Sequence, residues 1–336
     1  MAYEPEEGRY ESGMAYRRSG RSGVLMSALS LGFWHNFGGV SDFDTAKAMM
    51  ERAFDRGITC FDLANNYGPP YGSAETNFGK LMDLSFRPFR DEMFITTKAG
   101  YDMWPGPYGD HGSRKYLLSS LEQSLKRMRL DHVDLFYSHR FDPDTPLEET
   151  MQALVDAVRQ GKAVYAGISN YPVEAARRAC AYLRAHDTPC LCYQGKFSLL
   201  QRGHAASGDV IDTMREQGGG YVGFSPLAEG LLTDKYLNGI PPGSRMARRE
   251  HLTEAALTPG VLACVKALNG IAAGRGESLA TMALAWALQR EGVTSVIVGT
   301  SSVAQLEDNL KAVAAPPFTP DQIAAIDAAL ALQKGN

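Results

Sequence analysis

The stretch Ser113-Arg114-Lys115-Tyr116-Leu117-Leu118-Ser119-Ser120-Leu121-Glu122-Gln123-Ser124-Leu125-Lys126-Arg127-Met128 stands between two runs rich in β-branched and aromatic residues, at 93–99 and 133–139. Its charged side chains face away from one apolar stripe, and Ser113 can cap the first turn. The stripe consists of Leu117, Leu118, Leu121, Leu125 and Met128. We therefore predict a helix between two strands, which is the repeating unit of a parallel α/β sheet.

The same alternation continues along the chain. Predicted strands lie at residues 29–34, 58–64, 93–99, 133–139, 164–169, 190–194, 221–225 and 295–300. Predicted helices lie at residues 44–55, 73–82, 113–128, 147–159, 173–185, 208–216, 259–273, 278–289 and 303–312. Eight such units predict an α/β fold, a (β/α)8 TIM barrel with long loops at its C-terminal face. A doubly wound open sheet is the alternative, although no G-x-G-x-x-G follows a predicted strand.

Composition favours a single large domain. With 336 residues, 44% of them hydrophobic, the chain can bury one large core. We expect a flexible N-terminal segment at residues 1–13 and one barrel domain at residues 14–336. The 34 basic and 38 acidic residues are interspersed, so no nucleic-acid partner is expected. No stretch approaches the roughly 18 apolar residues of a membrane span, and the five cysteines fit a reducing compartment. We expect a cytoplasmic protein that binds neither a membrane nor a metal.

Ionisable side chains end three of the predicted strands. Asp62, Lys98 and His139 each lie where a strand passes into a loop, and Tyr67 follows Asp62 by five residues. Catalytic groups of such barrels gather at the C-terminal ends of the strands, so these four side chains are expected to meet. Taken alone, each of the three strand-end residues has a structural explanation. Asp62 could be a cap, Lys98 a solvated charge and His139 a histidine of the core. Their joint placement favours catalysis.

Two long segments are predicted to cover that end of the barrel. Residues 101–116 contain Trp104-Pro105-Gly106-Pro107-Tyr108, in which proline and glycine exclude a helix and the aromatic rings can keep water out. Residues 231–257 form a connection too long to be a simple turn.

Several motifs resemble those of the aldo-keto reductases over nearly the whole chain. The resemblance rests on residues 57–62 leading to Tyr67-Gly68 and Glu75, and on residues 120–128 leading to Asp134-Leu135 and His139. Residues 34–37, 65–70, 101–109 and 138–140 further resemble the bacterial L-glyceraldehyde-3-phosphate reductase branch, whose relatives include potassium-channel β-subunits.

The four ionisable side chains suit the reduction of a carbonyl group. This reaction needs a hydride donor and an acid that protonates the developing alkoxide, and no side chain supplies hydride, so a nicotinamide must bind. We expect Tyr67 to give the proton, with the Lys98 ammonium lowering the pKa of the phenol from about 10. Asp62 would keep Lys98 charged, and His139 would donate a hydrogen bond to the carbonyl oxygen. The resemblance implies the same four roles.

The resemblance also implies which residues hold the nicotinamide. Ser169, Asn170 and Gln194 match residues that bind its carboxamide, and Phe224 matches the aromatic side chain that stacks on its ring. Further candidates near the cofactor are Trp34, Asp62, Ser225, Pro226, Leu227 and Glu229.

A phosphate-binding corner is expected where the last strand meets a helix N-terminus, because free amides and the helix dipole favour anions there. The candidates are Gly299, Ser301, Gln305, Asp308 and Asn309. Lys235 and Arg245, on the long loop, match the family's cationic clamp and imply NADP(H) rather than NAD(H), since only the former carries a 2′-phosphate.

Two features depart from the family pattern. After Gln194, relatives usually continue with a Tyr-Asn-Leu-Leu type sequence, whereas this chain has Gly195-Lys196-Phe197-Ser198-Leu199-Leu200. Glu229 stands where an uncharged glutamine is common, which places a negative charge near the expected diphosphate. We expect effects on pocket packing and cofactor affinity, without loss of activity.

The resemblance implies NADPH-dependent reduction of small aldehydes, such as L-glyceraldehyde 3-phosphate or methylglyoxal, with a role in methylglyoxal detoxification and a homo-oligomeric state. The alternative is an NADP(H)-binding sensor or regulatory subunit with little turnover, like the channel-associated relatives.

Four residues are candidates for binding the substrate. Trp34 and Trp104 could line the pocket, and Arg114 and Arg140 could bind a substrate phosphate. The alternative is that Arg114 faces solvent in the first turn of its helix and that Arg140 pairs with a neighbouring aspartate, Asp142 or Asp144.

Overall fold

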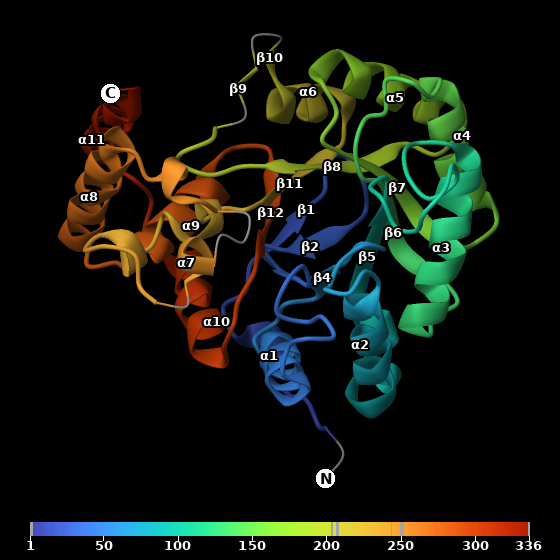
Figure 1. Cartoon of the computed structure of the whole chain (residues 1–336), viewed down its shortest axis with the longest axis horizontal. Coiled ribbons are helices and arrows are strands. Elements are labelled where there is room, and N and C mark those ends of the chain that lie inside the picture. Colours follow the sequence, from blue (N-terminus) through green and yellow to red (C-terminus); the bar gives the residue numbers. More distant parts are fainter. Residues whose placement is uncertain (1–2, 203, 206–207, 243, 249–251, 335–336) are drawn as a thin grey trace.

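Eight parallel strands close into a barrel in the computed structural model, which describes residues 3–202, 204–205, 208–242, 244–248 and 252–334 (Figure 1). Around the barrel the order is β11, β12, β3, β4, β5, β6, β7, β8. Their bounds are β3 Leu29–Gly32, β4 Cys60–Asp62, β5 Phe94–Ala99, β6 Val133–Ser138, β7 Ala163–Ser169, β8 Cys190–Lys196, β11 Gly220–Phe224 and β12 Val293–Val298. The predicted barrel is confirmed, and the open-sheet alternative is wrong, because β8 pairs with β11 to close the ring.

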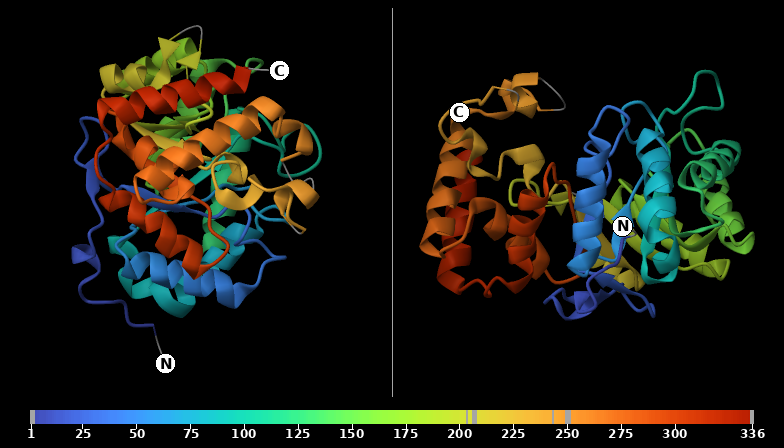
Figure 2. Two further views of the ribbon diagram at one scale, coloured as in Figure 1. Left: turned by 90° about the vertical axis from the view of Figure 1, so that its left-hand side faces the viewer. Right: turned by 90° about the horizontal axis from the view of Figure 1, so that it is seen from below.

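Helices follow the strands and surround the barrel (Figures 1 and 2). They are α1 Phe43–Asp55, α2 Ser73–Leu81, α3 Arg114–Met128, α4 Leu147–Arg159, α5 Val173–Ala185, α6 Val210–Gln217, α7 Arg245–Arg248, α8 Pro259–Gly274, α9 Leu279–Gln289, α10 Val303–Leu310 and α11 Pro320–Ala331. Short turns of 3-10 or π-helix lie at η1 Arg9–Glu11, η2 Met82–Phe86, η3 Arg87–Glu92, η4 Ala228–Gly230, η5 Asp234–Tyr236, η6 Glu254–Ala256, η7 Lys311–Ala314 and η8 Leu332–Lys334. Each helix predicted from the sequence is present, with boundaries shifted by a few residues. None of the described helices is long and apolar enough to cross a membrane.

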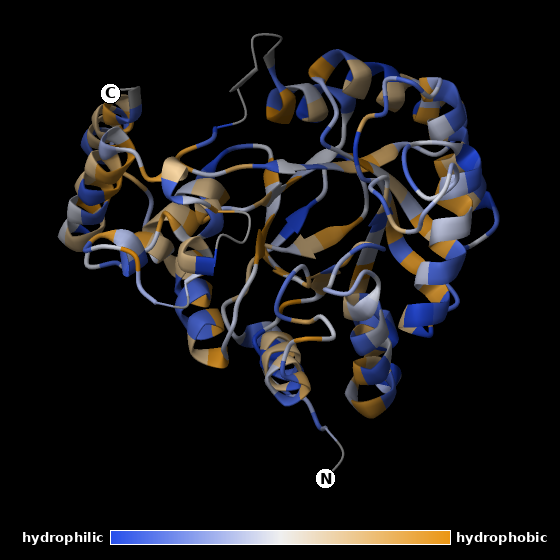
Figure 3. Cartoon of the chain, in the orientation of Figure 1, coloured by the Kyte–Doolittle hydropathy of each residue, from blue (hydrophilic) through white to orange (hydrophobic). Residues whose placement is uncertain are grey.

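Helix α3 shows how the apolar stripe produces this packing. The Ser113 side chain caps the helix by accepting from the Tyr116 amide, and Arg129 ends it in a left-handed conformation. The face toward the barrel buries Leu117, Leu121 and other apolar side chains, each worth about 1.5–3 kcal/mol when fully buried. Figure 3 shows hydrophobic residues interrupting the hydrophilic ones along the helices around the barrel.

A helical layer stands beside the barrel and has a hydrophobic core of its own. Helices α8, α9 and α11, orange and red in Figure 2, share the buried cluster that includes Leu268, Met282 and Ile326. The sequence pattern predicted the first two helices. It did not predict α11, whose Thr319 and Gln322 form a reciprocal capping box.

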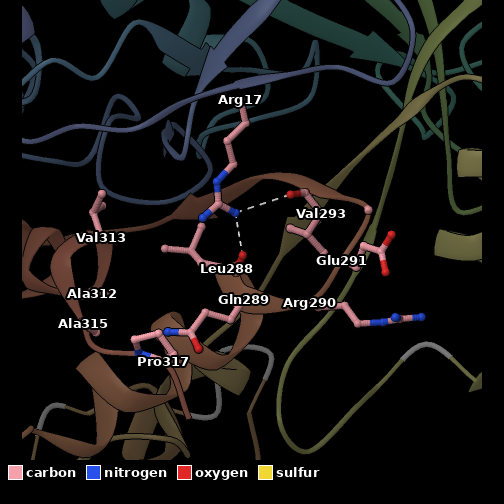
Figure 4. A pocket seen from close by; sticks show the side chains of 11 residues that line it. Arg17, Leu288, Gln289, Arg290, Glu291, Val293, Ala312, Val313, Ala315 and Pro317 are labelled. Carbon is pink, nitrogen blue, oxygen red and sulfur yellow. Dashed lines mark hydrogen bonds between the residues drawn. The ribbon is translucent and has the colours of Figure 1, made fainter.

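Two antiparallel hairpins were not predicted. The first pairs β1 (Tyr16–Arg18) with β2 (Leu25–Ser27), and the second pairs β9 (His204–Ala205) with β10 (Gly208–Asp209). From β1, Arg17 Nη1 donates to the Leu288 carbonyl at 2.5 Å and lies 3.5 Å from the Val293 carbonyl (Figure 4). The surrounding cavity has a volume of about 550 Å³. Gly292 and Val293 line it where β12 begins, so it lies at the end of the barrel opposite the predicted catalytic side chains.

The N-terminal residues contact the barrel. Tyr3 Oη donates to the Asp55 carboxylate at 2.8 Å, and the Tyr3 ring lies 5.2 Å from that of Phe86. Arg9 forms an ion pair with Glu92 at 2.5 Å. These contacts hold part of segment 1–13 against α1 and η3, and the flexibility of that segment stays a prediction.

Candidate active site

The predicted catalytic side chains come together at the C-terminal ends of three neighbouring strands. Asp62 ends β4, Lys98 lies near the end of β5, and His139 directly follows β6. Tyr67 lies on the loop between β4 and α2. Because alternate residues of a strand share a face, Thr96 points to the same side of β5 as Lys98. Both contact Asp62.

Lys98 is fully buried and bound on three sides. Its Nζ donates to Asp62 Oδ2 at 2.7 Å and to the Leu63 carbonyl at 2.7 Å, and it lies 3.3 Å from Tyr67 Oη. Burial lowers the pKa of Lys98, while the carboxylates of Asp62 and Glu75 oppose this shift. The Asp62 ion pair therefore helps to keep a fully buried ammonium next to the partly buried phenol.

The second oxygen of Asp62 is also bound. Its Oδ1 accepts from Thr96 Oγ1 at 2.8 Å and from Gln194 Nε2 at 2.8 Å. With both oxygens paired, the carboxylate is satisfied despite its burial, and it can hold Lys98 in one orientation. Thr96 was not among the candidates from the sequence, although its position two residues before Lys98 could have indicated it.

Tyr67 is held as a protonated phenol. Burial is the main reason that the pKa of Tyr67 is raised well above its usual value, and the charge of Asp62 and the nearby Tyr101 add to the shift. We expected the Lys98 ammonium to lower this pKa, whereas in the structure burial raises it. A phenol that keeps its proton at neutral pH can still pass it to an alkoxide, which is a much stronger base.

His139 is neutral and has an unsatisfied nitrogen. Burial, with the charges of Lys98 and Arg140, lowers its pKa well below the usual value. Its ring lies 6.1 Å from the Tyr67 ring and edge-on to Tyr101 at 4.7 Å. Among the described residues, the buried Nδ1 has no hydrogen-bond partner. A buried polar atom of this kind calls for an explanation, and a polar ligand bound between His139 and Tyr67 would provide one.

Arg140 anchors the aromatic segment at residues 101–116. Its Nε donates to the Gly100 carbonyl at 2.6 Å, its Nη2 pairs with Asp110 at 2.7 Å, and its guanidinium lies 4.5 Å above the Tyr101 ring. The alternative interpretation of Arg140, an ion pair with Asp142 or Asp144, is wrong, because its partner is Asp110. The Asp142 carboxylate instead accepts hydrogen bonds from the Gly112 and Asp144 amides and from the Thr145 hydroxyl.

The other candidate substrate residues occupy different surroundings. Arg114 lies in the first turn of α3 and pairs with Asp156 of α4 at 2.6 Å. The Trp104 ring packs 5.1 Å from that of Tyr116, on the aromatic segment. Trp34, which follows β3, is 37% exposed, and its ring lies 3.9 Å from that of His35.

The candidate carboxamide-binding residues lie beside the tetrad, at β7 and β8. Asn170 Nδ2 donates to the His139 carbonyl at 3.1 Å and to Ser169 Oγ at 3.0 Å, and Gln194 contacts Asp62 as described above. Asn170 has φ +57°, a left-handed conformation that is unusual outside glycine. The three residues expected to bind one group therefore lie at the ends of the adjacent strands β7 and β8.

The loop after β11 is strained. Beyond Phe224, Ser225 (φ +52°), Ala228 (φ +47°) and Glu229 (φ +60°) all adopt left-handed conformations, and each costs on the order of 1–3 kcal/mol. Strain of this kind gathers at ligand-binding segments, so its presence here supports a binding role for the loop. Pro226 is buried and Leu227 half-buried on the same loop.

The two departures from the family pattern contact each other. Lys196 Nζ lies 3.2 Å from Glu229 Oε1, between the end of β8 and the strained loop. Lys196 is opposite Phe224 in the parallel register of β8 and β11. The negative charge expected near the diphosphate is therefore paired with a cation of this chain.

At the predicted phosphate corner, Ser302 caps α10 and Gln305 Oε1 accepts from the Ser301 amide and hydroxyl, both at 3.0 Å. Asp308 pairs with Lys311 at 2.9 Å, and Asn309 is buried. A Cβ atom at Gly299 would meet nothing within 4 Å among the described atoms, so the space beside this residue is open.

The two residues of the predicted clamp lie on the long connection after β11. Lys235 is exposed on η5. Arg245 begins α7, and its side chain lies outside the described part of the chain.

Comparison with known proteins identifies the family. A model of the Aldo/keto reductase family matches residues 28–331. The chain is 53% identical over 318 residues to "L-glyceraldehyde 3-phosphate reductase" of Escherichia coli O157:H7, covering 94% of this chain and 92% of that protein. The protein of the same name from Escherichia coli strain K12 is 52% identical over the same shares. A "Probable voltage-gated potassium channel subunit beta" of Oryza sativa subsp. japonica is 35% identical, covering 94% of this chain and 96% of that protein. The chain therefore belongs to the aldo/keto reductase family and is an oxidoreductase.

Proposed function

We propose that this enzyme reduces small aldehydes to alcohols with NADPH and that Tyr67 gives the proton. The observation that carries this proposal is the buried Lys98, held 2.7 Å from Asp62 and 3.3 Å from the Tyr67 hydroxyl. An ammonium fixed beside a protonated phenol stabilises the phenolate that remains after the proton is transferred.

Each side chain has a distinct part in the reaction. Tyr67 holds a proton until charge develops on the substrate oxygen. Lys98 and Asp62 provide a preorganised charge pair, which needs no solvent reorganisation when the phenol ionises. The neutral imidazole of His139 can donate an N–H to the carbonyl oxygen and so orient it toward Tyr67.

A nicotinamide would supply the hydride when it is bound. Ser169, Asn170 and Gln194 would hold its carboxamide, and Phe224 would stack on its ring. The strained backbone after Phe224 and the open space at Gly299 support this placement of a dinucleotide. Aldo/keto reductases generally use NAD(P)H, and the choice of NADPH rests on Lys235 and Arg245.

The substrate proposed is L-glyceraldehyde 3-phosphate or a similar small aldehyde such as methylglyoxal. It is supported by the name of the Escherichia coli relatives, at 52–53% identity. The phosphate-binding roles of Arg114 and Arg140 stay predictions, because both guanidinium groups already bind other parts of the chain. A role in methylglyoxal detoxification, a cytoplasmic location and a homo-oligomeric state are part of the same proposal.

A steady-state screen tests this function. Wild-type protein is assayed with L-glyceraldehyde 3-phosphate, glyceraldehyde and methylglyoxal, each with NADPH and with NADH. We expect many turnovers per site and a preference for NADPH. The alternative, a cofactor sensor, is favoured by the channel-subunit relative at 35% identity. A single turnover followed by slow cofactor release, with every aldehyde, would support that alternative.

A further inference from the structure

Glu75 is a buried carboxylate outside the catalytic tetrad. It lies in the first turn of α2, has no exposed surface, and uses both oxygens. Oε1 accepts from Thr97 Oγ1 at 2.6 Å, and Oε2 accepts from Arg127 Nε at 2.7 Å. Burying a carboxylate is costly even when it is paired, so its presence here needs a reason beyond filling space.

Through Thr97, Glu75 is linked to the strand that carries Lys98. Thr97 precedes Lys98 in β5 and faces the opposite side of the strand, toward α2. The carboxylate therefore lies behind Lys98, outside the substrate pocket. Its charge still reaches the ammonium, and with Asp62 it opposes the effect of burial on the pKa of Lys98.

Through α2, Glu75 is also linked to the loop that carries Tyr67. The Tyr67 carbonyl accepts from the amides of Gly72 at 3.1 Å and Ala74 at 3.3 Å, at the start of the helix. Gly72 has φ +81°, and a Cβ at this position would lie 2.9 Å from Arg127 Cδ. The Arg127 side chain is thus packed against the turn that leads from Tyr67 into α2.

Arg127 fixes this arrangement from α3. Its Nη2 donates to Ser124 Oγ at 3.2 Å, and its side chain is 19% exposed. Helices α2 and α3 are so close that a Cβ at Gly79 would lie 2.3 Å from the Arg127 carbonyl oxygen. The Glu75–Arg127 pair therefore lies at a tightly packed junction between β5, α2 and α3.

We propose that Glu75 is a positioning residue for the proton transfer: with Arg127 and Thr97 as its partners it fixes Lys98 and Tyr67 relative to each other, and its own negative charge favours the Lys98 ammonium. The inference rests on the proposed function, since it assumes that Tyr67 is the acid. Among the described residues, six titratable groups surround Lys98. They are Asp62 on β4, Tyr67 on the loop after β4, Glu75 on α2, Tyr137 on β6, His139 directly after β6, and Cys192 on β8.

Two substitutions separate this role from a purely structural one. Glu75→Gln keeps the shape and removes the negative charge, whereas Arg127→Gln leaves the carboxylate without its neutralising partner. Both break the same ion pair, so a structural role predicts similar changes in both variants. Electrostatic positioning predicts opposite shifts in the alkaline limb of the kcat profile, where the Lys98 ammonium is lost. The limb should move to lower pH in Glu75→Gln and to higher pH in Arg127→Gln, by about half a unit or more.

The size of kcat gives a second measurement. Although glutamine has the same shape, it loses the ion pair with Arg127 that holds α2 and α3 together. In Glu75→Gln we therefore expect kcat at pH 7 to fall roughly 10- to 100-fold, because small displacements of catalytic groups are costly, while the Kd for NADPH changes less than about twofold. Glu277→Gln is the matched control. It breaks the buried Arg275–Glu277 pair, 2.9 Å long, in the helical layer. It should lower the melting temperature and leave the pH profile unchanged.

The outcomes distinguish the inference from the function on which it rests. A wild-type protein without turnover of any aldehyde would overturn both. An active wild type whose two variants shift the alkaline limb in the same direction, or leave it in place, would overturn the role of Glu75 alone. Should Glu75→Gln fail to fold, the direction of the shift in Arg127→Gln decides: a limb that does not move to higher pH overturns the inference.

Discussion

Replacing Lys98 by methionine should remove activity and destabilise the fold at the same time. Lys98 is fully buried and is the positive partner of Asp62, whose side chain is only 6% exposed. Methionine has a similar length, so the main change is the loss of the ammonium. The variant leaves Asp62 as a buried carboxylate without a counter-charge and the Leu63 carbonyl without its donor.

The expected loss of stability is about 3–5 kcal/mol, the usual cost of breaking a buried ion pair from one side. The hydrogen bonds from Thr96 and Gln194 to Asp62 Oδ1 remain and should keep the loss toward the lower end of that range. The assay is equilibrium unfolding in urea, with turnover of an aldehyde measured on the same samples. We expect turnover to fall roughly 10²–10⁴-fold.

A double variant, Asp62→Asn with Lys98→Met, is the control for this reasoning. It removes both charges, so it should regain most of the lost stability and stay inactive. The reasoning is refuted if the single variant loses less than about 1 kcal/mol, or if the double variant is no more stable than the single one.

Three further predictions concern the cofactor, the aromatic segment and pH. Arg245→Ala should weaken NADPH binding about 10- to 150-fold, since charge-assisted bonds to the 2′-phosphate are worth ~1.5–3 kcal/mol. Equal weakening of NADH binding would show that Arg245 supports the loop instead. Arg140→Ala should raise KM in parallel for phosphorylated and neutral aldehydes, because the substitution removes the hydrogen bonds to the Gly100 carbonyl and to Asp110. A rise in KM for the phosphorylated substrate alone would identify Arg140 as the phosphate ligand. Burial depresses the pKa of His139 in the folded protein, so as the pH falls below about 6.5 the imidazole is protonated first in the unfolded chain. The free energy of unfolding therefore decreases below that pH, by at most about 1.36 kcal/mol per pH unit. His139→Gln should flatten the unfolding free energy between pH 7.5 and 5, and an unchanged slope would contradict the depressed pKa.

Local sequence patterns predicted the barrel because each unit is encoded within a short window. In α3, a cap and a stripe of leucines suffice to define the helix and the face that it buries. The positions of Asp62, Lys98 and His139 follow from the parallel topology alone, since all three lie where a strand ends.

Features that depend on contacts distant in sequence could not be predicted. Lys196 and Glu229 are separated by a helix and a hairpin, and only the pairing of β8 with β11 brings them together. The alternative interpretation paired Arg140 with a near neighbour in sequence, but its partner Asp110 lies on the loop between β5 and α3. The raised pKa of Tyr67 could not be foreseen either, because it depends on burial that the sequence does not show.

The turnover of Tyr67→Phe, measured together with its affinity for NADPH, tests the central claim most directly. The ring still fills its place, while the hydroxyl that lies 3.3 Å from Lys98 Nζ is gone. We predict a loss of roughly 10²–10⁴ in turnover with a Kd for NADPH changed by less than about twofold. A variant that kept more than about a tenth of the wild-type turnover would show that Tyr67 is not the acid.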